Sequence, residues 1–198
     1  MKRILLACLM IILVSSSFVL AGNRPGAFSV RLADGYYFFA PKRHLKNTSI
    51  PTIELGYDFN RQWGIKGGAG VLNTRTKRDL GGAHGIVYTL DGVYHLPACQ
   101  HLEPYLLGGI GIISLKPSGS DPVNQANVNA GIGANYFFDP SIALGLEAKD
   151  LYTMSGGKND VMLTAGITFL FGGETPDVVT VTHVPAPAHP SYKGEDLE

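Results

Sequence analysis

The chain has 198 residues, of which 45% are hydrophobic and only 16% are charged, and its 16 basic and 16 acidic residues balance to a formal net charge of zero. This balance excludes the positive surface expected of a nucleic-acid-binding protein, and the apolar content excludes a mostly disordered chain. Of the two cysteines, Cys8 and Cys99, the first lies in a leader segment, so a secreted module held together by disulfides is excluded as well.

Residues 1–21 have the three parts of a secretory signal peptide. A short basic start precedes an unbroken apolar run over 4–14, and Val19 and Ala21 are the small residues at positions −3 and −1 of a cleavage site. A retained transmembrane helix is the alternative, but it would need roughly 20 predominantly apolar residues. We therefore expect cleavage before Gly22 and export of the mature chain from the cytoplasm.

Eight segments of the mature chain alternate in hydrophobicity with a period of two residues, and Gly, Pro, Asn, Asp and Ser are concentrated between them. One face of each segment is apolar and ends in aromatic residues, whereas the other consists mainly of Gly, Asn, Thr and single charges. This pattern predicts strands over 28–38, 50–59, 63–72, 86–96, 104–115, 128–138, 142–152 and 162–171.

Strands of soluble and of membrane barrels both alternate in hydrophobicity, so the composition of the two faces has to distinguish these classes. The polar face is too small to cover a water-exposed exterior, and the apolar face carries its aromatic residues at the strand ends. Tilted strands of about 9–11 residues with an aromatic girdle at each interface are typical of outer-membrane barrels. We expect one girdle to contain Tyr57, Phe59, Trp63, Tyr94, Tyr136, Phe138, Phe169 and Phe171, and the other Tyr36, Phe38, Tyr88 and Tyr152.

The connections between the predicted strands alternate in length. Short periplasmic turns and longer external loops are the pattern of outer-membrane barrels. An open strand edge in hydrocarbon would leave backbone groups unpaired, so the sheet must close. We predict an all-β fold, a closed eight-stranded antiparallel transmembrane barrel over 22–173. Its connections are expected to be long over 39–49, 73–85, 116–127 and 153–161, and short over 60–62, 97–103 and 139–141.

Several Gly-rich segments resemble strands of the OmpA-type outer-membrane barrels in their order and spacing. The segment 104–111 resembles the fifth strand of that family, and 129–137 and 166–173 resemble later ones. The resemblance covers about residues 27–173 and implies the same eight-stranded outer-membrane barrel. The Pro/Ala-rich run 184–190 resembles the hinge that leads to a peptidoglycan-binding domain in that family, but no peptidoglycan-binding motif follows it. We expect 174–198 to be a disordered periplasmic tail.

The last predicted strand carries the most specific motif. Residues 164–171 follow a polar-x-Gly-x-x-apolar-x-aromatic pattern that resembles the signal read by the outer-membrane assembly machinery. Strand addition explains such a signal, because an extended segment pairs through its backbone and its alternate side chains give specificity. Gly166, Phe169 and Phe171 would carry it, and the same residues are compatible with an ordinary lipid-facing strand.

Charged side chains on the inward faces of the strands predict the content of the lumen. An eight-stranded barrel is just wide enough inside for side chains to fill it, and lone charges there would be costly. We therefore predict a buried ion-pair network that closes the lumen, and we expect the inward-facing Asp58, near the periplasmic end, to be solvated. The network residues are Arg31, Glu54, Lys66, Asp91, Glu147 and Lys149.

Strict alternation places Asp34 on the lipid face, where a charge is unfavourable. Either a β-bulge at Asp34 and Gly35 turns the side chain away from lipid, or the register of this strand differs from the one inferred.

The favoured function is a structural or surface-interaction barrel of the outer membrane, and a small-solute pore is the alternative. A lipid A-modifying enzyme is less favoured, because His84 near an external strand end is followed by Gly85 rather than by Ser or Asn. No catalytic, cofactor or metal motif is present, so no cofactor is expected.

The first two predicted external loops are rich in basic residues, with Asp79 as their only acid. Lipopolysaccharide in the outer leaflet is rich in phosphate, which Arg and Lys bind through charge-assisted hydrogen bonds. These loops would contact lipopolysaccharide or another ligand at the cell surface, although solvated loop charges are the alternative. The candidate contacts are Lys42, Arg43, Lys46, Arg75, Lys77 and Arg78.

Overall fold

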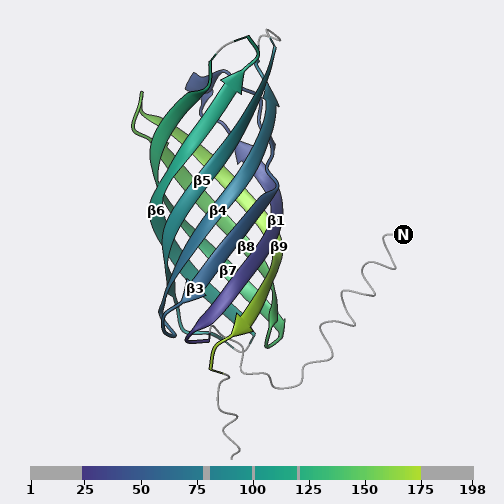
Figure 1. The fold of residues 1–198 in the computed structure, drawn as a ribbon, viewed down its shortest axis with the longest axis vertical. Helices are drawn as coiled ribbons and strands as arrows, with labels where there is room; N and C mark the ends of the chain where they lie inside the picture. The colour runs from purple at the N-terminus through teal and green to yellow at the C-terminus, as the bar shows by residue number, and fades with distance from the viewer. Residues whose placement is uncertain (1–23, 78–80, 100, 120, 175–198) are drawn as a thin grey trace, which may run out of the picture.

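A computed structural model describes residues 24–77, 81–99, 101–119 and 121–174 as one antiparallel β-sheet closed into a barrel (Figure 1). The short second strand and the third strand both pair with the first, every later strand pairs with the one before it, and the pairing of the first strand with the last closes the sheet. The expected signal peptide, its cleavage site and all but the first residue of the tail lie outside the described residues. Within the described ranges no helix is both long and apolar enough to cross a membrane. The elements are β1 (Ala27–Phe38), the 3-10 turn η1 (Pro41–Arg43), β2 (Thr48–Ser49), β3 (Thr52–Asp58), β4 (Trp63–Arg75), β5 (Gly82–His95), β6 (Leu102–Pro117), β7 (Val123–Asp139), β8 (Ile142–Thr153) and β9 (Lys158–Gly172).

The short β2 and β3 together form the second of the eight predicted strands. Both pair with β1 in one continuous antiparallel register. Pro51 separates them because it has no N–H group to donate. The backbone N–H of Ile50 still donates to the carbonyl of Gly35 at 3.1 Å, so the ladder continues across the break. The closed eight-stranded architecture is therefore confirmed.

The outer wall of the barrel is apolar between two aromatic girdles. Ile110 and Ile132 in the middle of the wall are each 61% exposed, as expected of side chains that face lipid. None of the predicted girdle residues is buried. Neighbouring rings contact each other, for example Trp63 and Tyr94 with their centroids 4.8 Å apart. The period-two pattern thus predicted correctly which side chains point outward.

All four external connections are shorter than predicted, although the first, over 39–47, is shorter by only two residues. The hairpin of β4 and β5 stays paired up to Arg75 and Gly82, and that of β6 and β7 up to Leu115 and Val123. The connection between β8 and β9 is reduced to 154–157. The prediction failed because these strand ends rise beyond the apolar band and carry polar residues on their outer face. Backbone pairing continues there without an apolar alternation to reveal it.

Asp34 faces outward, and neither explanation offered for it holds. The pairing of β1 with β9 runs through Asp34 and Ala165 without a register shift, so there is no bulge and the inferred register is correct. The carboxylate is exposed on the outer wall, and its Oδ1 accepts a hydrogen bond from the N–H of Gly35 at 2.9 Å. A carboxyl group therefore lies on the lipid face, one step closer to the middle of the wall than Tyr36 of the outer girdle.

The outer half of the lumen is filled by apolar side chains, which the sequence pattern did not predict. Leu72, Ile113 and Leu151 point inward from β4, β6 and β8, Ile50 points inward from the break between β2 and β3, and each of the four is 0% exposed. The connection after β1 folds into the mouth of the barrel and adds further buried side chains. The whole outer apolar layer consists of Tyr37, Phe39, Leu45, Ile50, Leu72, Ala83, Val87, Ile113, Leu115, Leu151 and Met162.

Candidate functional site in the barrel lumen

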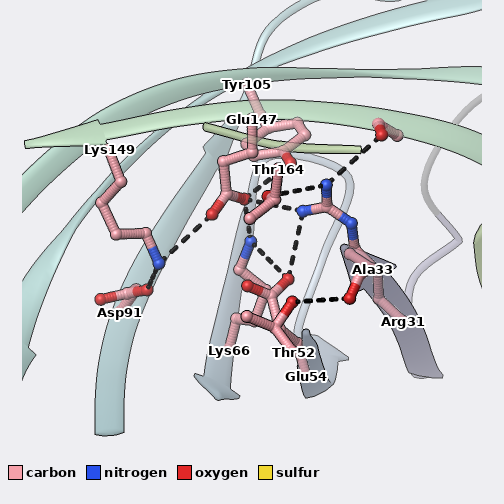
Figure 2. Close-up of polar contacts among 11 residues, drawn as sticks. Arg31, Ala33, Thr52, Glu54, Lys66, Asp91, Tyr105, Glu147, Lys149 and Thr164 are labelled. Atoms are coloured by element: carbon pink, nitrogen blue, oxygen red, sulfur yellow. Dashed lines mark hydrogen bonds and ion pairs between the residues drawn. The ribbon is translucent and has the colours of Figure 1, made fainter. Parts of the chain in front are cut away.

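Beneath the outer apolar layer, the six predicted lumen charges meet in one buried network (Figure 2). Arg31 reaches inward from β1, and its Nη1 lies 3.1 Å from Glu54 Oε2 of β3 and 3.1 Å from Glu147 Oε2 of β8. Its other terminal nitrogen, Nη2, donates to the carbonyl of Gly145 and to the hydroxyl of Thr164 at 3.3 Å each. The guanidinium of Arg31 thus connects β1 to β3, β8 and β9.

Lys66 of β4 joins the same two carboxylates from the opposite side (Figure 2). Its Nζ forms an ion pair with Glu54 Oε2 at 3.3 Å and a second one with Glu147. The hydroxyl of Tyr105 on β6 also donates to Glu147 Oε2, at 2.8 Å. Glu147 is therefore the centre of the network.

Lys149 extends the network across the lumen to β5. Its Nζ lies 2.7 Å from Asp91 Oδ2 and 3.2 Å from Glu147 Oε1, and the side chains of all three residues are 0% exposed. The six residues carry three positive and three negative charges. Such mutual compensation is what allows ionised groups to be buried.

A glycine makes room for the tyrosine that reaches the centre of the network. A Cβ atom at Gly133 on β7 would lie 2.2 Å from Cζ of Tyr105, so any larger residue would displace the ring. The ring is held across the face of Gly133 and lies 5.2 Å from Lys66 Nζ, within cation–π range.

A second polar cluster lies nearer the periplasmic end and was not predicted. His95 Nε2 is 3.2 Å from Asp58 Oδ1, and Nδ1 of the same ring contacts Glu103. Asp58 is therefore buried and paired rather than solvated, because His95 extends inward from the end of β5 and covers it. Glu103 was missed because the sequence assigned it to a turn, whereas β6 already begins at Leu102.

A cavity of ≈ 50 Å³ separates the two polar clusters. Its wall includes Arg31, Glu54 and Lys66 from the network and Asp58, His95 and Glu103 from the periplasmic cluster. A single water needs at least about 10–15 Å³ by the same kind of measure. The cavity has room for a few waters and no more.

A third cluster closes the mouth of the barrel and changes the interpretation of Arg43. Its Nη2 lies 2.8 Å from Asp160 Oδ2 and donates to Thr153 Oγ1 at 2.7 Å, and its side chain is only 3% exposed. The hydroxyl of Tyr37 donates to the same Asp160 carboxylate at 3.0 Å. Arg43 was expected among the lipopolysaccharide contacts, but η1 folds back over the mouth and directs it inward to a buried carboxylate.

The other predicted external cations divide between two sides of the mouth. Lys42 lies beside the β8–β9 connection, where its Nζ is 3.5 Å from the carbonyl of Gly157. Lys46, Arg75 and Lys77 are exposed near the outer end of β4. Arg78 lies outside the described residues.

The predicted assembly-signal residues lie at the seam where β9 meets β1. A Cβ atom at Gly166 would lie 2.3 Å from the carbonyl oxygen of Leu32, so this position requires glycine for the two strands to approach. Phe171 is 55% exposed on the outer wall, and Phe169 is partly exposed on the same face. Recognition of these residues by the assembly machinery stays a prediction.

Among the described side chains, no group of three or more His, Cys, Asp or Glu residues could hold a metal ion. Cys99 is an exposed free thiol in the connection between β5 and β6. The chemistry that the described lumen offers is therefore ion pairing and hydrogen bonding.

Comparison with known proteins places the architecture among outer-membrane barrels. The family model described as outer membrane protein beta-barrel domain matches residues 6–171. No curated protein sequence matches the chain.

Three solved structures illustrate the similarity, and at these identities the likeness concerns the fold alone. The N-terminal β-barrel domain of Pseudomonas aeruginosa OprF is 20% identical with a TM-score of 0.59, over 75% of this chain and 100% of that one. Neisserial surface protein A is 13% identical with a TM-score of 0.60, over 75% and 99%. Ail, the attachment invasion locus protein of Yersinia pestis, solved in complex with the heparin analogue sucrose octasulfate, is 18% identical with a TM-score of 0.52, over 74% and 99%.

Proposed function

Because the chain belongs to the outer membrane protein beta-barrel domain family, we propose that it acts as a closed structural and surface-interaction barrel of the outer membrane. The filled lumen carries this proposal. Solute passing from the outside would meet first the Arg43–Asp160 cluster, then the outer apolar layer and then the ion-pair network. Three successive barriers of different chemistry favour a barrel that does not conduct.

The two inner barriers oppose permeation for different physical reasons. Water or an ion in the outer apolar layer would find no polar partner on Leu72, Ile113 or Leu151. In the network each charge is already paired, so a permeating ion would have to displace a buried partner such as Lys149 from Asp91. A small-solute pore remains the alternative, and it requires both barriers to open together.

Conductance in planar lipid bilayers tests the proposal. The purified full chain should give no steady ionic current at protein concentrations well above those at which a porin control conducts. A variant with Leu72→Ala, Ile113→Ala, Leu151→Ala and Asp91→Asn shortens three of the eleven side chains of the outer apolar layer and also breaks one ion pair of the network, so both barriers are weakened and it should show the first measurable current. Ile110→Ala, Ile112→Ala and Leu163→Ala change the lipid face equally and serve as the matched control. Stable porin-like current from the unaltered chain would contradict a closed barrel.

The exposed external cations favour a surface role directed at anionic groups. Four exposed cations extend from the outer end of the barrel: Lys42, Lys46, Arg75 and Lys77. The structurally similar Ail barrel was solved in complex with the heparin analogue sucrose octasulfate. Sulfate and phosphate groups are recognised by the same charge-assisted hydrogen bonds. The outer leaflet offers phosphate on lipopolysaccharide, so we expect the neutralised variant of these four residues to bind lipopolysaccharide more weakly than the unaltered barrel. An unchanged affinity would mean that these charges are only solvated.

A further inference from the structure

A hollow of ≈ 740 Å³ opens on the outer wall beside the barrel mouth. The end of the connection after η1 forms one side of it, and the outer ends of β4 and β5 form the other. Hydrogen bonds hold the two sides together: Lys46 N donates to the carbonyl of Arg75 at 2.8 Å, and the Thr74 hydroxyl donates to the carbonyl of Lys46. The hollow therefore belongs to the folded barrel wall.

Three neighbouring strands place polar and basic side chains in one row beside this hollow. Asn73 of β4 is directly opposite His84 of β5, and His84 is directly opposite Lys116 of β6. All three are exposed, and so is Arg75, two residues beyond Asn73 on the same face. Directly opposed residues in antiparallel strands have Cβ atoms only about 4.5–5.5 Å apart. We call Asn73, Arg75, His84 and Lys116 the cationic wall.

The cationic wall begins where the lipid-facing surface ends. Val71 and Ile86 are the next outward residues toward the membrane on β4 and β5, and they are 46% and 37% exposed. Tyr88 of the outer girdle lies four residues from His84 on the same face of β5. Because aromatic girdles mark the membrane–water interface, the wall lies at the level of the outer-leaflet headgroups.

The chemistry of the wall suits a phosphate group. Among the described residues, neither Arg75 nor Lys116 forms an ion pair with a carboxylate. The His84 ring is oriented by a 2.7 Å hydrogen bond between its Nδ1 and Asn73 Oδ1. A guanidinium binds phosphate through two parallel hydrogen bonds, and an ammonium adds a point charge.

We propose that the cationic wall binds a phosphate group of lipid A, the membrane anchor of lipopolysaccharide. The inference rests on the proposed surface function and deepens it, because it assigns the phosphate contact to the barrel wall rather than to the loop tips. Lys116 enters the site only through strand pairing, since it is far from the two basic loops in sequence. A lipid headgroup at this depth can contact the wall while its acyl chains lie against Val71 and Ile86.

The test compares the full chain with two charge variants, each folded in detergent micelles. The wall variant combines Arg75→Gln with Lys116→Gln. The matched control combines Arg61→Gln with Lys158→Gln, which removes the same charge from the periplasmic turn and from the start of β9. Binding is measured as the rise of the thermal unfolding midpoint with added lipid A, and the heat-dependent gel shift confirms that each variant is folded.

We expect the wall variant to bind bis-phosphorylated lipid A roughly ten-fold more weakly than the unaltered chain, as for the loss of one or two hydrogen bonds to a charged group. The control should bind as the unaltered chain does, and lipid A without phosphates should not distinguish the three proteins. Equal affinities for the wall variant and the unaltered chain, or equal losses in the wall variant and the control, would overturn the proposal.

Two further arms separate this proposal from its alternatives. Inorganic phosphate should raise the midpoint far less than lipid A, and equal protection by both would show a site for free phosphate instead. A Lys42→Gln, Lys77→Gln variant that loses lipid A binding while the wall variant keeps it would overturn the wall site and leave the proposed surface function standing.

Discussion

Lys149 Nζ lies 2.7 Å from Asp91 Oδ2 at the centre of the barrel, and both side chains are completely buried. The pair joins β8 to β5 across the lumen rather than along the sheet. Strands that are not neighbours in the barrel wall are thereby connected from inside.

Replacing one member of this pair should destabilise the barrel strongly. Lys149→Met leaves Asp91 buried without its cation, so we expect a loss of about 3–5 kcal/mol in the free energy of unfolding. The double variant Lys149→Met, Asp91→Leu should recover most of that loss, because no lone charge remains. Urea unfolding in lipid vesicles measures the free energy of unfolding of Lys149→Met, Asp91→Leu and the double variant. If the loss in the double variant equals the sum of the losses in the two single variants, the pair is not coupled.

Removing only the hydroxyl of Tyr105 tests its hydrogen bond to Glu147. Tyr105→Phe keeps the ring over Gly133 and beside Lys66, so packing is conserved. We expect a loss of about 1.5–3 kcal/mol, the usual contribution of a hydrogen bond to a charged group. Tyr88→Phe on the lipid face is the matched control and should change stability by less than about 0.5 kcal/mol. The same unfolding measurement applies, and equal effects at both positions would contradict a special role for the Tyr105 hydroxyl.

Asp34 should lower the stability of the barrel in its present position. Its carboxylate is exposed on the lipid face, where acidic residues cost less than the ~2–4 kcal/mol of a basic one. We expect Asp34→Leu to raise the free energy of unfolding by about 1–2 kcal/mol in vesicles. Asp121→Leu, in the connection between β6 and β7, lies beyond the girdle and should bring no gain. A destabilised Asp34→Leu variant would mean that the carboxylate has a stabilising partner in the membrane.

The assembly role predicted for Phe169 and Phe171 can be separated from their contribution to folding. Replacing both with Ser should leave a protease-sensitive periplasmic form in cells, while the purified chain still refolds into detergent. Tyr136→Ser with Phe138→Ser removes two girdle rings from β7 instead and should still reach the outer membrane. Normal surface assembly of the Phe169, Phe171 variant, shown by fractionation and the heat-dependent gel shift, would remove the signal role.

The period-two alternation of hydrophobicity was sufficient to predict the fold and the ion-pair network in the lumen. A charge such as Glu147 or Lys66 on the inward face of a strand stands out, so the network could be read from the sequence. The outer apolar layer could not, because around Ile112 and Ile113 both faces of β6 are apolar and the period-two signal disappears. A buried aliphatic layer and a lipid-facing one have the same composition.

The contacts made by the loop residues could not be predicted from the hydrophobicity pattern. Arg43 and Asp160 are separated by 117 residues, and their pairing depends on the 3-10 turn that folds over the mouth. Both residues lay in segments assigned to loops, where side-chain direction follows from backbone dihedral angles that no periodicity reveals. Basic loop residues were therefore all assigned to the outside, although one of them completes the interior.

The seam between β1 and β9 has a consequence for the order in which the barrel can form. Ala27 pairs with Gly172, so the first strand finds its second neighbour only in the last one. Until β9 is synthesised, one edge of β1 has no backbone partner and can pair with the wrong chain. Contacts of such large sequence separation are slow to form, because a long loop must close first. The closing seam is therefore expected to form late, and both unpaired edges persist until it does.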